Sequence, residues 1–374
     1  MRHRLVLAGG GHAHLYTLSR LAELTARGAL VTLVTPDRYH YYSGMAPAML
    51  AGTCRPQDIR FDVACLAERG GGSCVIGTAH RIDTVNRSLI LQDGTGIPYD
   101  TLSCNVGSSV VLPSPTQANV IPAKPIDGLL AARNRVRELL AEAVEPSLLV
   151  VGGGPAGVEL AGALWRLARD AGRPARVTLV TGGTLLAGMP PKAQKTARHS
   201  LASRGIAIHE QTRVTRFGDN SALLPTGQEL PFQMALLATG VTPPAIFRDS
   251  GLPVADDGSL LVNDRLQAVT HPELLGGGDC ITPPDGRLTR VGVYAVRQGP
   301  VLFANLLARI NGTSLSPFSP QKRFLQILNL GDGSGLMIRG SWVLAGRIAY
   351  LLKQIIDYRY MHHYQRCGER NAPS

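Results

Sequence analysis

The fold is decided by one stretch of sequence, Leu148-Leu-Val-Val-Gly-Gly-Gly-Pro-Ala-Gly-Val-Glu159. Its first four residues are apolar and typical of a strand, the three glycines form a turn, and a helical pattern follows to about residue 171. A second apolar run, Val177-Thr-Leu-Val180, comes after that helix. The stretch therefore predicts a strand, a tight turn, a helix and a parallel strand, which together form one βαβ unit.

The same order occurs at the beginning of the chain. Leu5-Val-Leu-Ala8 leads into Gly9-Gly-Gly-His-Ala-His14, a helical pattern runs to about residue 27, and Leu30-Val-Thr-Leu-Val34 follows. The two units also share an identical five-residue sequence, Val-Thr-Leu-Val-Thr, at residues 31–35 and 177–181. The sequence therefore predicts an α/β protein with two Rossmann-like units related by an internal repeat.

A glycine-rich turn between a strand and a helix is typical of a pyrophosphate-binding site. The glycines allow a tight turn and close approach of a phosphate, and the helix N-terminus offers free N–H donors. The second turn satisfies the GxGxxG pattern fully, whereas the first has His14 in the place of the third glycine. The residues predicted to contact a dinucleotide are Gly9, Gly11, His12, Ala13 and His14 in the first turn, and Gly152, Gly154, Pro155, Ala156 and Gly157 in the second.

Neither unit has the acidic residue that usually ends the second strand and binds a ribose 2′-hydroxyl. The first unit has Thr35-Pro36-Asp37, so Asp37, two residues further on, can take the place of the missing acid. The second unit has Thr181-Gly-Gly183. An acid there would repel a 2′-phosphate, so both NADH and NADPH stay open for the second unit. Three basic residues a little downstream could meet that phosphate or form a solvated helix face: Lys192, Lys195 and Arg198.

Composition places the chain among ordinary globular proteins that are basic. It has 374 residues, 44% of them hydrophobic, and a formal net charge of +11. No helix-turn-helix, RNP-type or zinc-finger pattern occurs, so we expect no nucleic-acid partner. The charge fits cofactor phosphates or an anionic membrane surface better. No run of 18 uncharged apolar residues exists, so no membrane-spanning helix is expected.

The six cysteines show neither a CxxC pair nor the spacing of metal ligands. We interpret them as scattered thiols of a reducing compartment, which predicts no disulfide framework, no metal site and a cytoplasmic location. Cys54 follows the first helix without a CxxxxC partner. A redox-active cysteine pair is therefore not expected either.

Five segments together resemble the pyridine nucleotide–disulfide oxidoreductase superfamily: Gly9–His14, the Tyr99-Asp-Thr-Leu102 strand, Gly152–Glu159, Ala238-Thr-Gly240 and Gly277-Gly-Asp279. Within it, the chain looks like the type II NADH:quinone oxidoreductases. The Gly9–His14 turn, residues 42–47 and residues 293–299 most resemble the flavoprotein module often fused to selenophosphate synthetase. The resemblance implies FAD at the first unit and NAD(P)H at the second.

The resemblance also implies roles for single residues. Catalytic roles fall to Glu159 as a nicotinamide-side or proton-handling group, to Gln298 beside the flavin and to Lys124 pointing toward it; for Glu159 and Lys124, a surface or crossover position is the alternative. Pro300 is compatible with the first turn of the helix near Gln298. Cofactor-binding roles fall to Thr35, Pro36, Asp37, Ser43, Gly44, Pro47, Thr239, Gly240, Gly278, Asp279, Arg297 and Gln298.

The segment from residue 321 onward contains eight lysine and arginine residues against three acidic ones. Two strands and then a helix from Trp342 to Tyr364 are predicted, with apolar residues such as Ile348 and Leu351 on one face. A basic amphipathic helix of this kind can lie in a membrane interface. Packing on the body of the protein or on a twin subunit, as in a homodimer, is the alternative.

These observations predict a FAD-binding domain of residues 1–115 and 244–318, with an NAD(P)H-binding domain of residues 116–243 inserted in it. A small α+β platform of residues 319–374 with the amphipathic helix follows. The expected activity passes hydride from NAD(P)H to flavin and electrons to a quinone-type acceptor, on the inner face of the cell membrane. Two alternatives stay open: a small redox protein or a selenium or sulfur species as acceptor, and a slow nucleotide sensor that acts by binding a partner.

Overall fold

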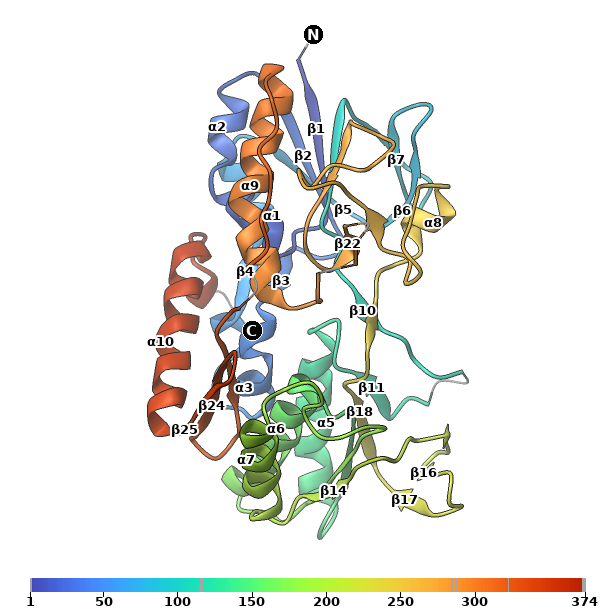
Figure 1. Cartoon of the computed structure of the whole chain (residues 1–374), viewed down its shortest axis with the longest axis vertical. Helices are drawn as coiled ribbons and strands as arrows, with labels where there is room; N and C mark the ends of the chain where they lie inside the picture. The colour runs from blue at the N-terminus through green and yellow to red at the C-terminus, as the bar shows by residue number, and fades with distance from the viewer. Residues whose placement is uncertain (1, 115–116, 284, 287, 322, 372–374) are drawn as a thin grey trace.

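The computed structural model describes residues 2–114, 117–283, 285–286, 288–321 and 323–371 (Figure 1). Two parallel sheets lie one above the other in this view, and a C-terminal helix lies at the left, near the level where the two meet. The expected domain boundary between residues 115 and 116 lies outside the described residues. The strands on either side of it nevertheless belong to different sheets.

The first sheet is built around the N-terminal βαβ unit. All five strands are parallel and are ordered β21-β9-β1-β2-β5. Their bounds are β1 Arg4–Ala8, β2 Leu30–Thr35, β5 Ser73–Ile76, β9 Thr101–Cys104 and β21 Leu274–Gly276. The edge strand β21 therefore returns to this sheet from beyond the second one, as expected if one nucleotide-binding unit is inserted in the other.

Four helices cover the first sheet: α1 His12–Ser19, α2 Leu21–Thr25, α4 Val63–Arg69 and α9 Gly292–Asn311. The helix expected to run to residue 27 is interrupted at Arg20, which separates α1 from α2. Helix α9 lies against α1 (Figure 1) and ends at Gly312, whose φ of 68° is left-handed. The sequence predicts a helix over residues 291–310 that stops at Asn311-Gly312, and the structure confirms both ends within one residue.

The second sheet repeats this architecture. Its order is β11-β18-β12-β13-β14, again entirely parallel. The strands are β11 Val120–Pro122, β12 Ser147–Val151, β13 Arg176–Val180, β14 Ala207–His209 and β18 Met234–Leu237, and the helices are α5 Gly128–Glu142, α6 Pro155–Asp170 and α7 Pro191–Ala202. The decisive stretch forms β12, the glycine turn and α6, as predicted.

Short elements connect and flank the two sheets. Strands β10 Ser109–Val110 and β19 Val241–Thr242 pair where the chain crosses from one sheet to the other and back. The remaining elements are β3 Tyr39–Tyr41, α3 Ala46–Leu50, β4 Arg60–Asp62, β6 Ala79–Asp83, β7 Ser88–Leu91, β8 Gly96–Pro98, β15 Arg216–Phe217, β16 Ser221–Leu223, β17 Glu229–Pro231, α8 Ile246–Asp249, β20 Leu260–Leu261 and β22 Ile281–Thr282.

The C-terminal platform is an antiparallel sheet with one helix. It consists of β23 Gln326–Asn329, β24 Gly335–Arg339, β25 Trp342–Gly346 and α10 Arg347–Tyr364. The prediction that the helix begins at Trp342 is wrong, because residues 342–346 pair with β24 along their whole length. Gly346 has a φ of 121°, which a helix cannot continue, so α10 begins one residue later.

A disulfide joins Cys65 in α4 to Cys367 beyond α10, across 302 residues of sequence. The interpretation of all six cysteines as scattered thiols is therefore wrong for this pair, and the argument from the cysteines for a reducing compartment loses its support. Sequence spacing gave no sign of the pair because the partners meet only when the last segment docks. There, the buried Glu369 accepts hydrogen bonds from the backbone N–H groups of Asp62 and Cys367.

Helix α10 buries two charged residues and exposes several large apolar ones. Lys353 and Asp357 are buried, whereas Ile348, Leu351 and Ile355 are 74, 58 and 56% exposed. The helix therefore packs on the body of the protein, as one alternative from the sequence has it, but through the face of Lys353 and Asp357, and the apolar residues named above stay exposed. Within the described ranges, every helix is too short or too polar to span a bilayer.

Candidate active site

The two glycine turns have the same geometry. Gly9 and Gly152 have φ values of 92° and 130°, which L side chains rarely adopt. A Cβ on Gly152 would lie 2.2 Å from the carbonyl oxygen of Ala238, and one on Gly9 would lie 2.3 Å from that of Asn105. Each first glycine thus faces the residue that follows the neighbouring strand. The repeat found in the sequence is therefore also a structural repeat, in which the first glycine of each turn lies against the backbone of the neighbouring strand's end.

The turns differ at the third position of the motif. A Cβ on Gly157 would fall 1.7 Å from the Gly152 oxygen, so only glycine fits there. In the first turn, the fully buried His14 bonds the Gly9 oxygen through Nδ1 at 2.6 Å and the hydroxyl of Ser103 through Nε2 at 2.8 Å. Burial lowers the pKa of His14 to about 4, so its ring is neutral at physiological pH. We infer that His14 ties the turn to the sheet.

A cavity of about 410 Å³, which we call the central cavity, lies between the two sheets. Both helix N-termini reach it, through Gly11 and His12 of the first unit and Pro155 and Ala156 of the second. Twelve of the predicted site residues line it: Gly11, His12, Ser43, Gly44, Pro47, Lys124, Pro155, Ala156, Glu159, Thr239, Gly278 and Asp279. The structure thus brings together residues that lie as far apart as 12 and 279 in the sequence.

An ion pair lies in the wall of the central cavity. Lys124 Nζ contacts the carboxylate of Asp279, and both groups bond the hydroxyl of Ser108 at 2.9 Å. Asp279 follows β21, and Lys124 follows β11 of the other sheet. The pair therefore bridges the two nucleotide-binding units inside the central cavity.

A histidine pair forms another part of the wall. His12 Nδ1 lies 2.6 Å from His40 Nε2, so one ring donates to the other. Burial lowers the pKa of His12 to about 4 and that of His40 well below its ordinary value, so both rings are neutral. His12 Nε2 has no hydrogen-bond partner among the described residues. It is an orphaned buried polar atom beside the cavity.

Glu159 lies on α6 in the wall of the central cavity. Its Oε1 accepts the backbone N–H of Asn329 at 2.7 Å, which links the second unit to the platform. Burial raises the pKa of Glu159 from 4.5 to about 7, although Lys353 and the Asn329 N–H favour the charged form. A carboxyl group with this pKa can hold or release a proton near neutral pH.

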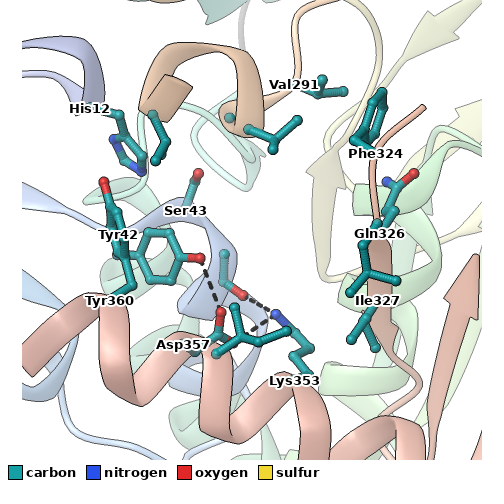
Figure 2. A pocket seen from close by; sticks show the side chains of 16 residues that line it. His12, Tyr42, Ser43, Val291, Phe324, Gln326, Ile327, Lys353, Asp357 and Tyr360 are labelled. Carbon is teal, nitrogen blue, oxygen red and sulfur yellow. Dashed lines mark hydrogen bonds and ion pairs between the residues drawn. The ribbon is translucent and has the colours of Figure 1, made fainter. Parts of the chain in front are cut away.

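A second cavity of about 320 Å³, the platform cavity, adjoins the first. Ser43, Gly44, Val291 and Gly292 line both cavities and separate them. Figure 2 shows Phe324, Gln326 and Ile327 along one side of the platform cavity, opposite a group of polar side chains from α10 and residue 42.

Those polar side chains form a buried network. Lys353 Nζ donates to Asp357 Oδ2 at 2.9 Å and to the Gly44 oxygen at 2.7 Å, and the Tyr42 hydroxyl donates to Asp357 Oδ1 at 3.0 Å (Figure 2). Burial would lower the pKa of Lys353, but the carboxylates of Glu159 and Asp357 outweigh it and hold that pKa above its ordinary value. An ammonium group is thus kept in a cavity that also has apolar lining residues such as Phe324 and Ile327.

The helix N-terminus expected beside Arg297 and Gln298 lies elsewhere. Helix α9 begins at Gly292, so Pro300 is in its interior and not in its first turn. Gln298 is buried and accepts the backbone N–H of Gly278 at 2.6 Å, whereas Arg297 is exposed. Among the described residues, Val291, Gly292 and Ala295 represent this helix in the central cavity. The helical pattern of the sequence already predicts a start at residue 291, so only the placing of Pro300 in the first turn is wrong.

Several predicted cofactor residues are not among the residues that line either cavity. The carboxylate of Asp37 accepts a hydrogen bond from the Tyr39 N–H at 2.7 Å, and the backbone oxygen of Asp37 accepts one from the Thr35 hydroxyl at 3.0 Å. The loop that contains Pro36 is therefore held by hydrogen bonds within itself. Gly240 follows the cavity residue Thr239. Their part in binding, like that of the other site residues, stays a prediction.

Sequence reasoning missed Lys353, Asp357, His40 and Asn105 as site residues. Asn105 Oδ1 accepts the backbone N–H of Ala13 at 3.0 Å, and its amide donates to the Gly277 oxygen at 2.6 Å. For α10, a signal was available, since a lysine and an aspartate four residues apart share the helix face opposite its exposed isoleucines. His40 and Asn105 gave no signal of this kind.

The glycine turns fit dinucleotides. A Cβ on Gly154 would meet no atom within 4 Å, so the space above the N-terminus of α6 is open. At α1, a Cβ on Gly11 would lie 2.4 Å from Asn105 Oδ1, so only the bare backbone is accommodated there. The second turn therefore has room for a pyrophosphate at a helix N-terminus, and the first turn brings bare backbone to the start of α1, as dinucleotide binding requires.

The sequence profile of the pyridine nucleotide-disulphide oxidoreductase family matches residues 3–299. A demethylphylloquinone reductase of Synechocystis is 26% identical over 94% of this chain and 92% of its own length. A type II NADH:quinone oxidoreductase of Staphylococcus epidermidis is 23% identical over 96% of both chains. The crystal structure of the sulfide:quinone oxidoreductase of Aquifex aeolicus shares the fold, with a TM-score of 0.81, 18% identity and coverage of 100% of this chain and 93% of that one.

Proposed function

The chain belongs to the pyridine nucleotide-disulphide oxidoreductase family and is an FAD-dependent NAD(P)H dehydrogenase, and from this premise we propose that its electron acceptor is a quinone. The observation that carries the proposal is the platform cavity, which combines apolar lining residues with a buried ammonium group and is bounded by a helix that exposes large apolar side chains. Two relatives of nearly the same length are named for quinone reduction.

On the first unit, the Gly9 turn and α1 would hold the pyrophosphate of FAD, and Asp279 would accept hydrogen bonds from its hydroxyl groups. Ser43 and Gly44 would lie beside its ring, since they separate the two cavities. When bound, FAD accepts hydride from NAD(P)H and passes electrons to the second substrate. The division into residues 1–115 with 244–318, 116–243 and 319–374 is part of this proposal.

On the second unit, the Gly152 turn would orient NAD(P)H in the central cavity. Pro155 and Ala156 place the N-terminus of α6 there, and Glu159 follows one turn later on the same helix. Glu159 holds its proton below about pH 7 because it is buried. It can therefore exchange a proton with the buried network of α10, whose Lys353 it influences electrostatically.

On the acceptor side, the platform would bind the quinone ring. A quinone takes up protons as well as electrons, and Lys353 Nζ holds a proton beside the apolar wall. Asp357 keeps that ammonium group charged and oriented, and the Tyr42 hydroxyl holds Asp357 in place. Positioned proton donors of this kind contribute about 10²- to 10⁴-fold to a rate.

The exposed face of α10 supports docking on a membrane, where quinones are dissolved. Trp342 is 83% exposed, and Ile348, Leu351 and Ile355 lie on the same platform. An amphipathic helix binds a bilayer through such a face, and an exposed tryptophan suits the headgroup region. We propose a peripheral position on the inner face of the cell membrane; a second copy of the chain on this face is the competing occupant.

The test separates the two half-reactions of the FAD-loaded protein under anaerobic conditions. NADPH or NADH is mixed first, then a soluble quinone or ferricyanide, while the visible absorbance of bound FAD is followed. Lys353→Met should slow reoxidation by the quinone at least tenfold. Reoxidation by ferricyanide, which takes no proton, and reduction by NAD(P)H should not change.

The matched control is Lys195→Met on the exposed surface of α7, which should behave as the wild type. Equal loss with quinone and ferricyanide would show that Lys353 has only a structural role. Fast reoxidation by a small redox protein or by a selenium or sulfur species, with none by quinones, would replace the proposed acceptor. Slow turnover with every acceptor would favour the sensor.

A further inference from the structure

The end of β13 is where the second unit would meet the adenosine ribose of its cofactor. In NADH-binding units, an acidic side chain there bonds the 2′-hydroxyl, whereas an arginine nearby accommodates the 2′-phosphate of NADPH. Here β13 ends at Val180 and is followed by Thr181, Gly182 and Gly183. The loop therefore offers no carboxylate of its own.

The side chain of Arg213 lies over Gly182. A Cβ on Gly182 would fall 2.7 Å from Cγ and 2.8 Å from Nε of Arg213. The arginine thus fills the space that an acidic side chain at residue 182 would take. A Cβ on Gly183 would meet no atom within 4 Å, so the region next to Arg213 is open.

Arg213 is also exposed and carries no hydrogen bond or ion pair with any described residue. The acid that follows β14 is committed elsewhere. Glu210 accepts the Leu185 N–H at 2.6 Å and pairs with Arg198 through Nε at 2.8 Å and a second nitrogen at 2.9 Å. Arg198, one of the candidates from the sequence, is thereby occupied, and Glu210 is neutralised as a ribose acceptor.

We propose that Arg213 binds the 2′-phosphate of the nicotinamide cofactor and makes NADPH the preferred donor. The proposal rests on the donor site of the proposed function but not on its acceptor. A guanidinium group forms paired charge-assisted hydrogen bonds with a phosphate, which are worth about 10- to 100-fold in affinity. NADH lacks this phosphate, so its affinity does not depend on Arg213.

The experiment measures binding of the adenosine part of the cofactor, without its nicotinamide. Calorimetric titration of the FAD-loaded protein uses 2′,5′-ADP and, as the matched ligand without the 2′-phosphate, 5′-AMP. We expect 2′,5′-ADP to bind at least tenfold more tightly than 5′-AMP in the wild type. Arg213→Gln should abolish this difference and leave the affinity for 5′-AMP unchanged. The matched control is Arg216→Gln, at an exposed arginine of β15, which should retain the tighter binding of 2′,5′-ADP.

A second variant keeps the test independent of the first. Gly182→Glu places a carboxylate where Arg213 now lies and should reverse the preference, so that 5′-AMP binds more tightly. Equal affinity for both ligands in the wild type, a preference that survives Arg213→Gln, or failure of both ligands to bind would overturn the proposal. A clear preference for 2′,5′-ADP in a protein that quinones cannot reoxidise would contradict the proposed acceptor only.

Discussion

Glu159→Gln should stabilise the protein, and only above pH 4.5. The buried carboxyl group has a pKa of about 7 against 4.5 when unperturbed. Between these values, the folded state holds a proton that the unfolded state has lost, so the stability of the wild type falls as the pH rises. One pKa unit corresponds to about 1.36 kcal/mol, so the penalty reaches about 3 kcal/mol above pH 7. A neutral glutamine avoids it and still accepts the Asn329 N–H.

The measurement compares thermal unfolding of the FAD-loaded proteins by circular dichroism from pH 4.5 to 8. For a chain of this length, 3 kcal/mol corresponds to a rise in Tm of about 4 °C. The variant should match the wild type at pH 4.5 and exceed it by this amount at pH 8. The exposed Glu229→Gln on β17 serves as the control and should show no such trend. A constant difference between variant and wild type at all pH values would refute the reasoning.

Three further predictions concern the platform. Cys65→Ser should lower Tm, because opening a loop of 302 residues removes up to about 5 kcal/mol of stabilisation; dithiothreitol should lower Tm in the wild type and have no effect in the variant. Ile348→Ser should weaken binding to anionic liposomes about tenfold in flotation assays. The control Val85→Ser, at a residue that is 89% exposed on a distant turn, should not weaken it. Equal losses of binding in both variants would argue against docking through α10. Asp357→Asn removes a carboxylate that raises the pKa of Lys353, so the rate of quinone reoxidation should begin to fall at a lower pH than in the wild type; an unchanged pH profile would exclude Lys353 as the proton donor.

The two βαβ units could be predicted from the sequence because their signals are local. Strand β12, the glycine turn and α6 follow one another within residues 147–170, and apolar period and glycine spacing define each of them. The same holds for the stop at Gly312. Their backbone conformations depend on neighbouring residues, which a single sequence displays directly.

The parts that failed depend on contacts between distant segments. Cys65 and Cys367 meet only through the docking of the last residues, and Lys353 is buried because β23 and the Gly44 segment cover it. The strand of residues 342–346 was mistaken for a helix since apolar and polar residues alternate poorly there and only pairing with β24 decides it. Arg213 reaches Gly182 from beyond the next strand, which no spacing rule anticipates.

The order of the strands in the first sheet has a consequence for synthesis of the protein. Strands β1, β2, β5 and β9 are made early, but their sheet is completed only by β21, after the whole second sheet has been made. At about 5–20 residues per second, the 302 residues between Cys65 and Cys367 take roughly 15–60 s to translate. Throughout this interval, Cys65 lacks Cys367 as a partner, and the second sheet receives all its strands before Cys367 is made. The disulfide can therefore form only after the final segment has been made, when both sheets already have all their strands.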